Sequence, residues 1–460
     1  MLDSSTPVFV SNEKMKATFE QLRDYVTSRN WHALQAELSH MQEIDVAAFI
    51  ESLPAELALL VFRTLEKDLA AEIFANFSND QQELLIGAIT DRELQHLMKG
   101  LMIDDAVDMI GELPANLVNR ILRHTSPKTR SLINQFLLYP EFSAGSIMTA
   151  EFVQLKKEMS VKEAIAHIRK VGEDKETIYT CYVTTRNRML EGIVSVRTLL
   201  LSSDDQILET LMDPDYISVT TTDDQEHVAD LFRRYDLLSI PVTDHENRLV
   251  GIITVDDIID VIEEENTEDF QKMGALIPSE KPYLKTGVFT LAKNRIVWLM
   301  VLLFSGMITG SILARFEDAF MVLPILVSFI PMLTDTGGNA GSQSSTLIIR
   351  GMAVNEISMK DLGTVMWKEI RVALIVGFIL SFFTALRVFF MNGEVMVALT
   401  VGIALYATVI MAKTIGGILP MVAKVTGMNP AIMAAPLITT IVDALSLFLY
   451  FSIAQRLLNI

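Results

Sequence analysis

The sequence is poor in cysteine, in basic residues and in the short signatures of common enzymes. Of its 460 residues only Cys181 is a cysteine, so neither a disulfide within the chain nor a site with several thiolate ligands can form. Asp and Glu outnumber Lys and Arg by 57 to 38, which argues against nucleic-acid binding, because phosphates attract Lys and Arg. No P-loop, nucleophile elbow or zinc signature is present, so the sequence gives no support to an enzyme.

The first residues lack the features of a secretory signal. The segment Met1–Thr6 has neither a basic start nor an apolar run after it. A single cysteine also suits a reducing compartment. We therefore expect the soluble part of the chain to stay in the cytosol.

Charged residues become scarce toward the C-terminus. Residues 281–460 contain 13 Lys and Arg and 8 Asp and Glu, which leaves 25 basic and 49 acidic residues for 1–280. A bilayer span takes roughly 20 apolar residues. The apolar runs predict five spans, at 288–314, 319–347, 364–390, 395–423 and 429–456. An acidic, water-soluble half thus precedes a membrane half.

The loops between the predicted spans indicate an orientation. With the N-terminus in the cytosol, the loops 348–371 and 421–429 also lie in the cytosol. They carry five basic residues, Arg350, Lys360, Lys368, Arg371 and Lys424. The positive-inside rule favours this arrangement. An odd number of spans then places Ile460 outside.

One charge interrupts the last apolar run. Asp443 is the only formally charged residue among the 31 from Val425 to Gln455. Intramembrane carboxylates are costly and usually serve a function, so we expect Asp443 to hold a cation. The alternative is a packing role, with the carboxyl protonated or hydrogen-bonded to Thr439 or Thr440.

The second predicted span is unusually polar. Pro324 and Pro331 interrupt it, and a run rich in Gly and Ser follows from Thr334 to Ser345. Such sequence at membrane depth must line a cavity or be covered by protein. Its glycines would free backbone carbonyls, and Asn339 offers a side-chain oxygen. Oxygen ligands of this kind suit Mg²⁺ or Ca²⁺ rather than a softer metal.

The last span adds a helical face and a proline to the candidate ion pathway. Ala435, Thr439 and Asp443 stand at i, i+4 and i+8 and share one face. Pro436 lacks a backbone donor, which would leave the carbonyl of Ile432 free to face water or an ion.

The acidic half begins with a helical region. From residue 15 to about 138, apolar residues recur at three- and four-residue spacing, and Leu53–Leu57 is echoed by Leu113–Leu117. Repeated short helices predict a solenoid. A cluster of three aspartates, Asp104, Asp105 and Asp108, has the start of a helix as its simpler interpretation.

Two copies of one α/β unit follow Gly145. The expected strands Thr180–Val183 and Leu190–Val194 return after 59 residues. The pair resembles tandem CBS domains, which are regulatory α/β modules and often bind adenine nucleotides. Thr254 and Asp257 match the Thr-x-x-Asp element that holds a ribose in nucleotide-binding members. The first copy has Thr198 where the element needs an Asp, so the resemblance implies at most one good ribose site, with ATP as the candidate ligand of the pair.

An acidic helix is predicted beyond the second copy. Asp257, Asp260, Glu264 and Glu268 fall near one of its faces. Like charges placed so closely repel each other unless they are solvated or bridged by cations, and a solvated face is the simpler interpretation for such a helix alone. The helix joins the regulatory half to the membrane half, so a change in its charge could act on the spans.

Taken together, these parts resemble the MgtE family of magnesium channels. The runs Gly337–Gln343 and Asn429–Asp443 match the family's most specific motifs. The resemblance implies an all-α solenoid N-domain (1–140), tandem CBS domains (141–262), a connecting plug helix (263–285) and a five-span pore domain (286–460). It also implies a homodimer in the cell membrane that takes up Mg²⁺ through a pore on its two-fold axis and closes when cytosolic Mg²⁺ is plentiful.

The resemblance also assigns residues to ions. The pore would be lined by Gly338, Asn339, Ala435, Thr439 and Asp443. Regulatory Mg²⁺ would bind two further groups, the first made of Asp224, Glu226, Asp236, Asp260, Glu265, Glu268 and Asp269 and the second of Glu72, Asp104, Asp108 and Asp257. Arg233 would reduce ion occupancy in the first group or replace an ion there. Two other classes stay open, a divalent-cation carrier coupled to Na⁺ or H⁺ and a membrane sensor that does not conduct.

Overall fold

The computed structural model describes residues 13–279, 283–284, 286–316 and 323–458. The predicted beginning of the second span (319–322), the segment Met1–Thr6 and parts of the predicted connecting segment (280–282 and 285) lie outside the described residues. The chain divides into two compact units, Met1–Ile262 and Glu263–Ile460.

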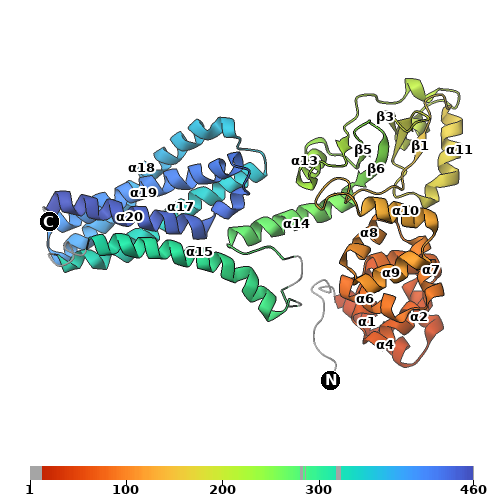
Figure 1. Cartoon of the computed structure of the whole chain (residues 1–460), viewed down its shortest axis with the longest axis horizontal. Coiled ribbons are helices and arrows are strands. Elements are labelled where there is room, and N and C mark those ends of the chain that lie inside the picture. The colour runs from red at the N-terminus through yellow and green to blue at the C-terminus, as the bar shows by residue number, and fades with distance from the viewer. Residues whose placement is uncertain (1–12, 280–282, 285, 317–322, 459–460) are drawn as a thin grey trace. The chain divides into compact units, whose positions relative to one another are not determined.

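Short helices build the N-terminal part of the first unit. They are α1 (Glu13–Thr27), α2 (Trp31–Leu38), α3 (Glu43–Glu51), α4 (Ala55–Phe62), α5 (Lys67–Ala75), α6 (Asn79–Ala88), α7 (Asp91–Gly100), α8 (Ile103–Glu112), α9 (Ala115–His124) and α10 (Pro127–Phe136). Between α3 and α10, helices two places apart along the chain pack against each other, and the short helices lie stacked together (Figure 1). This stack confirms the predicted solenoid.

The repeated Leu-Pro-Ala segments mark equivalent helix starts. Pro54 and Pro114 are the residues just before α4 and α9, with φ of −57° and −58°. Proline fixes φ near this value and disfavours helical backbone in the residue before it. The sequence repeat therefore sets the point at which two of the stacked helices begin.

Two α/β repeats complete the first unit, each with a three-stranded mixed sheet. The strands are β1 (Gln154–Leu155), β2 (Thr180–Thr184), β3 (Leu190–Ser195), β4 (Val219–Thr220), β5 (Ser239–Thr243) and β6 (Leu249–Thr254), and the helices are α11 (Val161–Val171), η1 (Gly172–Asp174), α12 (Val196–Leu201), η2 (Leu208–Thr210), α13 (Gln225–Tyr235) and α14 (Val255–Met273). The sheet orders are β1-β2-β3 and β4-β5-β6. Val183 faces Gly192 and Val242 faces Gly251, so both repeats share one register.

The solenoid and the second repeat share one hydrophobic core. Ile110 and Ile133 belong to the same buried cluster as Val242 and Ile258, whereas the first repeat has a core of its own around Val183. Removal of this apolar surface from water stabilises the contact between the solenoid and the second repeat. It also holds α8 and the start of α14 in one folded body.

The second unit is a bundle of long helices. These are α15 (Val288–Arg315), η3 (Pro324–Phe329), α17 (Ile330–Ala353), η4 (Met359–Asp361), α18 (Leu362–Asn392), α19 (Val395–Val425), η5 (Pro430–Met433) and α20 (Ala435–Leu458). Helix α19 packs against α17, α18 and α20, and α15 packs against α20 (Figure 1). Four of the five predicted spans, those on α15, α18, α19 and α20, are long and apolar enough to cross a membrane.

Helix α17 corrects the expectation for the glycine-rich run. Residues Thr334–Ser345 lie within one continuous α-helix, so their carbonyls belong to a helix and are not freed by open backbone as predicted. Glycine is a poor helix former in isolation, but here α19 and α20 cover the glycine face. The polar residues of this helix keep it out of the group that qualifies as spans by hydropathy.

The proline of the last span also lies at a different place from the one expected. Pro436 is the second residue of α20, where a helix needs no backbone donor. Ile432 belongs to the separate turn η5. No helical hydrogen bond is therefore broken at Pro436, so the predicted reason for a free carbonyl at Ile432 does not apply.

Candidate ion pathway and regulatory carboxylates

Glycines allow α17 to approach α20 and α19 closely. A methyl group added to Gly338 would stand 3.0 Å from Cγ2 of Thr439. One added to Gly337 would stand 2.8 Å from Cγ2 of Thr408 and 3.0 Å from Oγ of Ser446. Small residues at such contacts are the usual means of bringing membrane helices together. Asn339 follows Gly338 in the chain and is exposed next to this contact.

A polar stripe runs along the open side of α17. Asp335, Asn339 and Gln343 are exposed and stand at i, i+4 and i+8. On α20, Ala435 is exposed, and Thr439 and Asp443 are half-buried. Polar groups at membrane depth must face water or other protein. The two stripes therefore border a surface that lipid cannot cover well.

The carboxylate of Asp443 has no hydrogen bond or ion pair within the described residues. The hydroxyls of Thr439 and Thr440 donate instead to the carbonyl of Pro436, at 3.0 and 2.8 Å. The hydrogen-bonded form of the packing alternative is therefore wrong, and a protonated carboxyl stays an alternative to a bound ion. An ion or water is left as the natural partner of this group.

A second carboxylate, which the sequence analysis did not assign, acts on the first. Asp335 of α17 is close enough to Asp443 for their charges to interact. Two carboxylates in an apolar unit repel each other unless a cation balances them. Its place one turn before Asn339 on the exposed stripe was the signal that could have identified Asp335.

The acidic helix contacts the turn that leads into α20. Within the second unit, Nδ2 of Asn429 donates to Oδ1 of Asp269 at 2.8 Å. The Oδ1 of Asn429 accepts from the backbone N–H of Ala431, also at 2.8 Å, and so caps η5. Asp269 thus holds the segment immediately before the helix that carries Asp443. Its neighbour Glu268 pairs with Lys272 on the same helix.

A buried group of carboxylates lies in the first unit. Burial, with repulsion from neighbouring carboxylates, raises the pKa of Asp104 well above its usual value and the pKa of Asp105 to about 6. Burial and the charge of Asp257 raise the pKa of Glu176 to about 7. Burial also raises the pKa of Asp257 to about 6, although Thr254 donates to it at 2.7 Å.

This group needs protons or cations to balance it. Asp104 and Asp257, both predicted as ion ligands, come together there, and Asp105 and Glu176 join them unpredicted. No three acidic, His or Cys side chains in the described parts of the chain stand in a ready-made metal geometry. An ion would therefore bind through water or after small side-chain movements.

The other predicted regulatory residues are dispersed. Glu72 and Asp108 are exposed on α5 and α8. Asp224 caps α13 by accepting from the backbone N–H of Glu226 at 2.9 Å. Asp236 ends that helix in the left-handed conformation, with φ of 51°.

Arg233 and the α14 residues complete the predicted set. Arg233 pairs with Asp230 on its own helix, and this pair gives no support to its predicted role in place of an ion. Asp260 and Glu265 lie on α14, and Asp260 adds to the charges around Asp257.

The two repeats differ at the position predicted to hold a ribose. In the second, Thr254 is bonded to the Asp257 carboxylate. In the first, the equivalent bond joins the hydroxyls of Ser195 and Thr198 at 2.8 Å. The two side-chain hydrogen bonds are placed alike, but only the second repeat has a carboxylate that could bind a ribose.

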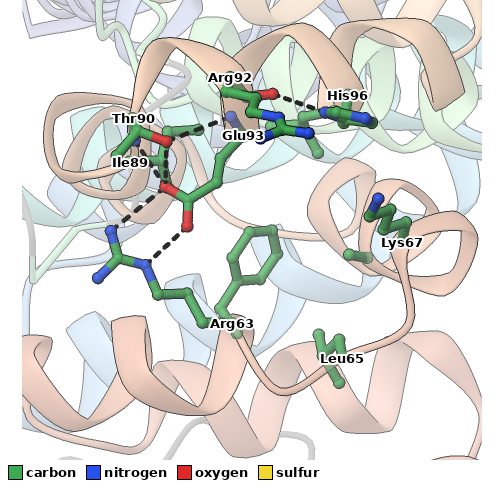
Figure 2. A pocket seen from close by; sticks show the side chains of 11 residues that line it. Arg63, Leu65, Lys67, Ile89, Thr90, Arg92, Glu93 and His96 are labelled. Atoms are coloured by element: carbon green, nitrogen blue, oxygen red, sulfur yellow. Dashed lines mark hydrogen bonds and ion pairs between the residues drawn. The ribbon is translucent and has the colours of Figure 1, made fainter.

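A cavity of about 330 Å³ in the solenoid lies apart from all these residues. Arg63, Lys67, Arg92 and His96 are among its lining residues (Figure 2). The carboxylate of Glu93 accepts from Arg63 at 2.9 and 3.3 Å and so neutralises one of these cations. None of the predicted site residues lines it.

Comparisons with known proteins match the helical N-terminal region, the two α/β repeats and the membrane region. Residues 330–453 match a family model described as a divalent cation transporter, residues 41–142 match the MgtE intracellular N domain, and residues 144–205 and 208–264 match the CBS domain. A magnesium transporter MgtE of Thermus thermophilus is 34% identical over 95% of this chain and 98% of its own length. The chain belongs to the MgtE family.

Other MgtE proteins agree with this assignment. A magnesium transporter MgtE of Bacillus subtilis is 31% identical over 92% of this chain and 93% of its own length. Among solved structures, the soluble part of a magnesium transporter covers 55% of this chain and 99% of that one, with a TM-score of 0.53 and 29% identity. The cytosolic domain of the Mg²⁺ channel MgtE in complex with ATP covers 53% and 99%, with a TM-score of 0.51 and 32% identity.

These matches confirm the fold of an MgtE protein. An N-domain and tandem CBS domains precede a helical membrane region, and the family is one of membrane transporters rather than enzymes. The chain is therefore a multi-pass membrane protein.

Proposed function

We propose that this chain is the subunit of a Mg²⁺ channel that admits Mg²⁺ across the cell membrane and closes when Mg²⁺ binds to its cytosolic half. Membership of the MgtE family supports the substrate. The observation that carries the proposal is Asp443, a half-buried carboxylate without a hydrogen-bond or ion-pair partner in the described residues, on a polar stripe next to Thr439. By the positive-inside rule the N-terminus lies in the cytosol and the C-terminus outside.

The pathway is completed by a second copy of the chain. Lipid cannot satisfy the polar groups on the exposed stripe of α17 and the half-buried face of α20, so protein or water must cover them. A two-fold axis beside them would bring two Asp443 carboxylates to one ion and cover both stripes. A homodimer with the pore on its axis satisfies this need.

Hydration decides how the ion is held. Mg²⁺ gives up its waters reluctantly and usually keeps several of them. The Asp443 pair would therefore attract a largely hydrated ion, while the oxygens of Thr439 and Asn339 accept hydrogen bonds from its waters. Gly338 lets α17 approach the Thr439 face of α20 closely, and the exposed Ala435 adds only a methyl group to the wall.

Closure is driven by charge on the cytosolic side. Mg²⁺ bound near Asp104 and Asp257 would relieve repulsion among the buried carboxylates, and Mg²⁺ near Asp260 and Glu265 would do the same along α14. With its charge balanced, α14 keeps Asp269 on Asn429 and holds the turn before α20 in place. Loss of Mg²⁺ restores the repulsion and favours release of this contact. ATP would bind the second CBS domain beside Thr254 and Asp257.

The test is Mg²⁺ flux through the purified protein in liposomes, with Mg²⁺ varied on each side. We expect flux that saturates with external Mg²⁺ and falls when Mg²⁺ rises on the cytosolic side. Flux that requires a Na⁺ or H⁺ gradient would show a coupled carrier instead. Liposomes that gain no Mg²⁺ would rule out the channel.

A further inference from the structure

Three helices of the membrane unit bring a buried acid and a buried base to one hydroxyl. Ser344 of α17 is fully buried, Glu369 of α18 is 9% exposed and Lys413 of α19 is 5% exposed. The Oγ of Ser344 donates to Oε2 of Glu369 at 2.6 Å. The Nζ of Lys413 donates to the same Oγ at 3.2 Å. The hydroxyl therefore bridges the two charged groups.

These charges are unexplained by the ion pathway. Ionisable groups inside a membrane protein are costly and are kept where they serve a function. Neither Glu369 nor Lys413 contacts Asp443 through any hydrogen bond or ion pair within the described residues. Because a hydroxyl can donate and accept at once, Ser344 can join an acid and a base that do not themselves meet.

Close to these three side chains, the backbones of α17 and α19 meet at a pair of glycines. A methyl group added to Gly416 would stand 2.2 Å from the carbonyl oxygen of Gly341. On the side of α19 that faces α18, one added to Gly417 would stand 3.4 Å from Cγ of Glu369. A glycine brings two helices close but contributes no side chain that could interlock with the neighbouring helix. Directional hydrogen bonds are then needed to fix the position of one helix along the other.

We propose that Glu369, Ser344 and Lys413 form a clasp that fixes the axial position of α17 against α18 and α19 and so positions the pore wall. This inference rests on the proposed Mg²⁺ pathway. Ser344 follows Asn339 by five residues, or about 7.5 Å along a helix that rises 1.5 Å per residue. A shift of α17 at the clasp therefore moves Gly338 and Asn339 by the same amount relative to Thr439.

The three side chains are positioning residues, because they act on the ion only through α17. Loss of the clasp should change how tightly and how selectively Mg²⁺ is held. A role in folding alone would lower the yield of assembled protein and leave the half-saturating Mg²⁺ concentration of each channel unchanged.

The first test compares two buried hydroxyls in the full-length protein in liposomes. Ser344→Ala removes the bridge, and we expect a half-saturating Mg²⁺ concentration raised roughly threefold to tenfold, the scale of one ordinary hydrogen bond. Ser381→Ala on α18 is the matched control. The Ser381 hydroxyl is also buried but has no hydrogen-bond partner in the described residues, so its loss should leave the concentration unchanged.

The second test exchanges the charges. Glu369→Lys and Lys413→Glu each place two like charges at the clasp, and each should lower both the melting temperature and the affinity for Mg²⁺. The double exchange restores one acid and one base around the hydroxyl and should recover much of both. Melting needs no transport, so it measures the clasp independently of the proposed function.

The outcomes separate the two proposals. If the double exchange restores both the melting temperature and the half-saturating Mg²⁺ concentration toward their wild-type values, the clasp and its positioning role are supported. Unchanged half-saturation and selectivity in Ser344→Ala, with assembled protein at normal yield, would overturn the positioning role. If the wild-type protein shows no Mg²⁺ flux, the proposed function fails and the positioning role fails with it, whatever the melting data show.

Discussion

Asp443 stands where a membrane protein can least easily keep a carboxylate, and its replacement gives the most direct measure of its role. We expect Asp443→Ala to abolish Mg²⁺ uptake, because the variant removes the charge that draws the hydrated ion to the pathway. The measurement is flux in liposomes, with assembly checked by size-exclusion chromatography. Glu394→Gln, at an exposed carboxylate before α19, is the control and should conduct normally. Normal flux in Asp443→Ala would contradict the proposed pathway.

We expect the negative charge of Asp335 to strengthen Mg²⁺ binding at Asp443 through its electric field. Asp335→Asn removes a negative charge close to Asp443, so we expect the half-saturating Mg²⁺ concentration to rise by up to about tenfold at low salt. Exposed charges are screened within about 10 Å at 0.1 M salt. The difference from wild type should therefore shrink as salt is added to the flux assay. An effect that does not depend on salt would mean that Asp335 acts by shape rather than by charge.

The residues found from the sequence are those that contrast with their neighbours. Asp443 was evident because it is the single charge in an apolar run. Asp335 precedes a stretch that is already polar, so its charge did not stand out. Glu369 and Lys413 each lie in a different predicted span, and only packing brings them to Ser344. Contacts of this kind between distant segments cannot be derived from one sequence.

The close contact between α17 and α19 at Gly341 and Gly416 gives a prediction for the membrane bundle. Gly416→Ala would force a methyl group against the carbonyl of Gly341, and α17 and α19 would have to separate. We expect a loss of about 1–3 kcal/mol in stability, measured as a lower melting temperature, together with reduced flux. Gly310→Ala on α15 is the control, since nothing lies within 4 Å of its added methyl group. Equal effects of the two changes would contradict this account of the contact.

The solenoid offers a pH-dependent test at the start of α7. Burial acts to raise the pKa of Glu93, but hydrogen bonds from Thr90 and Arg63 outweigh it and hold that pKa below its usual 4.5 (Figure 2). A lowered pKa stabilises the fold above pH 4.5, and this stability is lost as the pH falls through the folded-state pKa.

Glu93→Ala should therefore cost roughly 1 kcal/mol near neutral pH, the scale of a helix cap. The difference in free energy of unfolding between Glu93→Ala and the wild-type protein should become smaller at acidic pH. Urea unfolding of a fragment that ends at Met273 measures both effects. Glu83→Ala, at an exposed carboxylate on α6, is the control and should show neither. A constant difference at all pH values would contradict the role of the Glu93 charge.

Elements with a clear period were predictable from the sequence, and α17 was not. The three- and four-residue spacing predicted the stacked helices, and the repeated strands appear in the same register in both copies. Glycine and serine in the second span favoured open backbone on their own propensities. The packing of α19 and α20 overrides that preference and keeps the run helical.

For the whole molecule, the prediction concerns control by Mg²⁺. Deletion of residues 1–262 removes the solenoid and both CBS domains but leaves the compact unit Glu263–Ile460. We expect channels that still conduct and that high cytosolic Mg²⁺ no longer closes, because the buried carboxylates around Asp104 and Asp257 are gone. Flux with Mg²⁺ raised on the cytosolic side measures this, with the full-length protein in parallel. Undiminished inhibition in the shortened protein would refute the gating scheme.

The polarity of α17 has a consequence for how the protein is made. Among the described residues, four helices of the membrane unit qualify as spans by hydropathy, and α17 does not. Its glycine face is covered by α19 and α20, which are synthesised after it. A segment this polar gains little by entering lipid alone. During biogenesis, α17 should therefore settle into the bilayer only after the last two helices emerge from the ribosome, so that the wall of the pathway is the last part of the bundle to be completed.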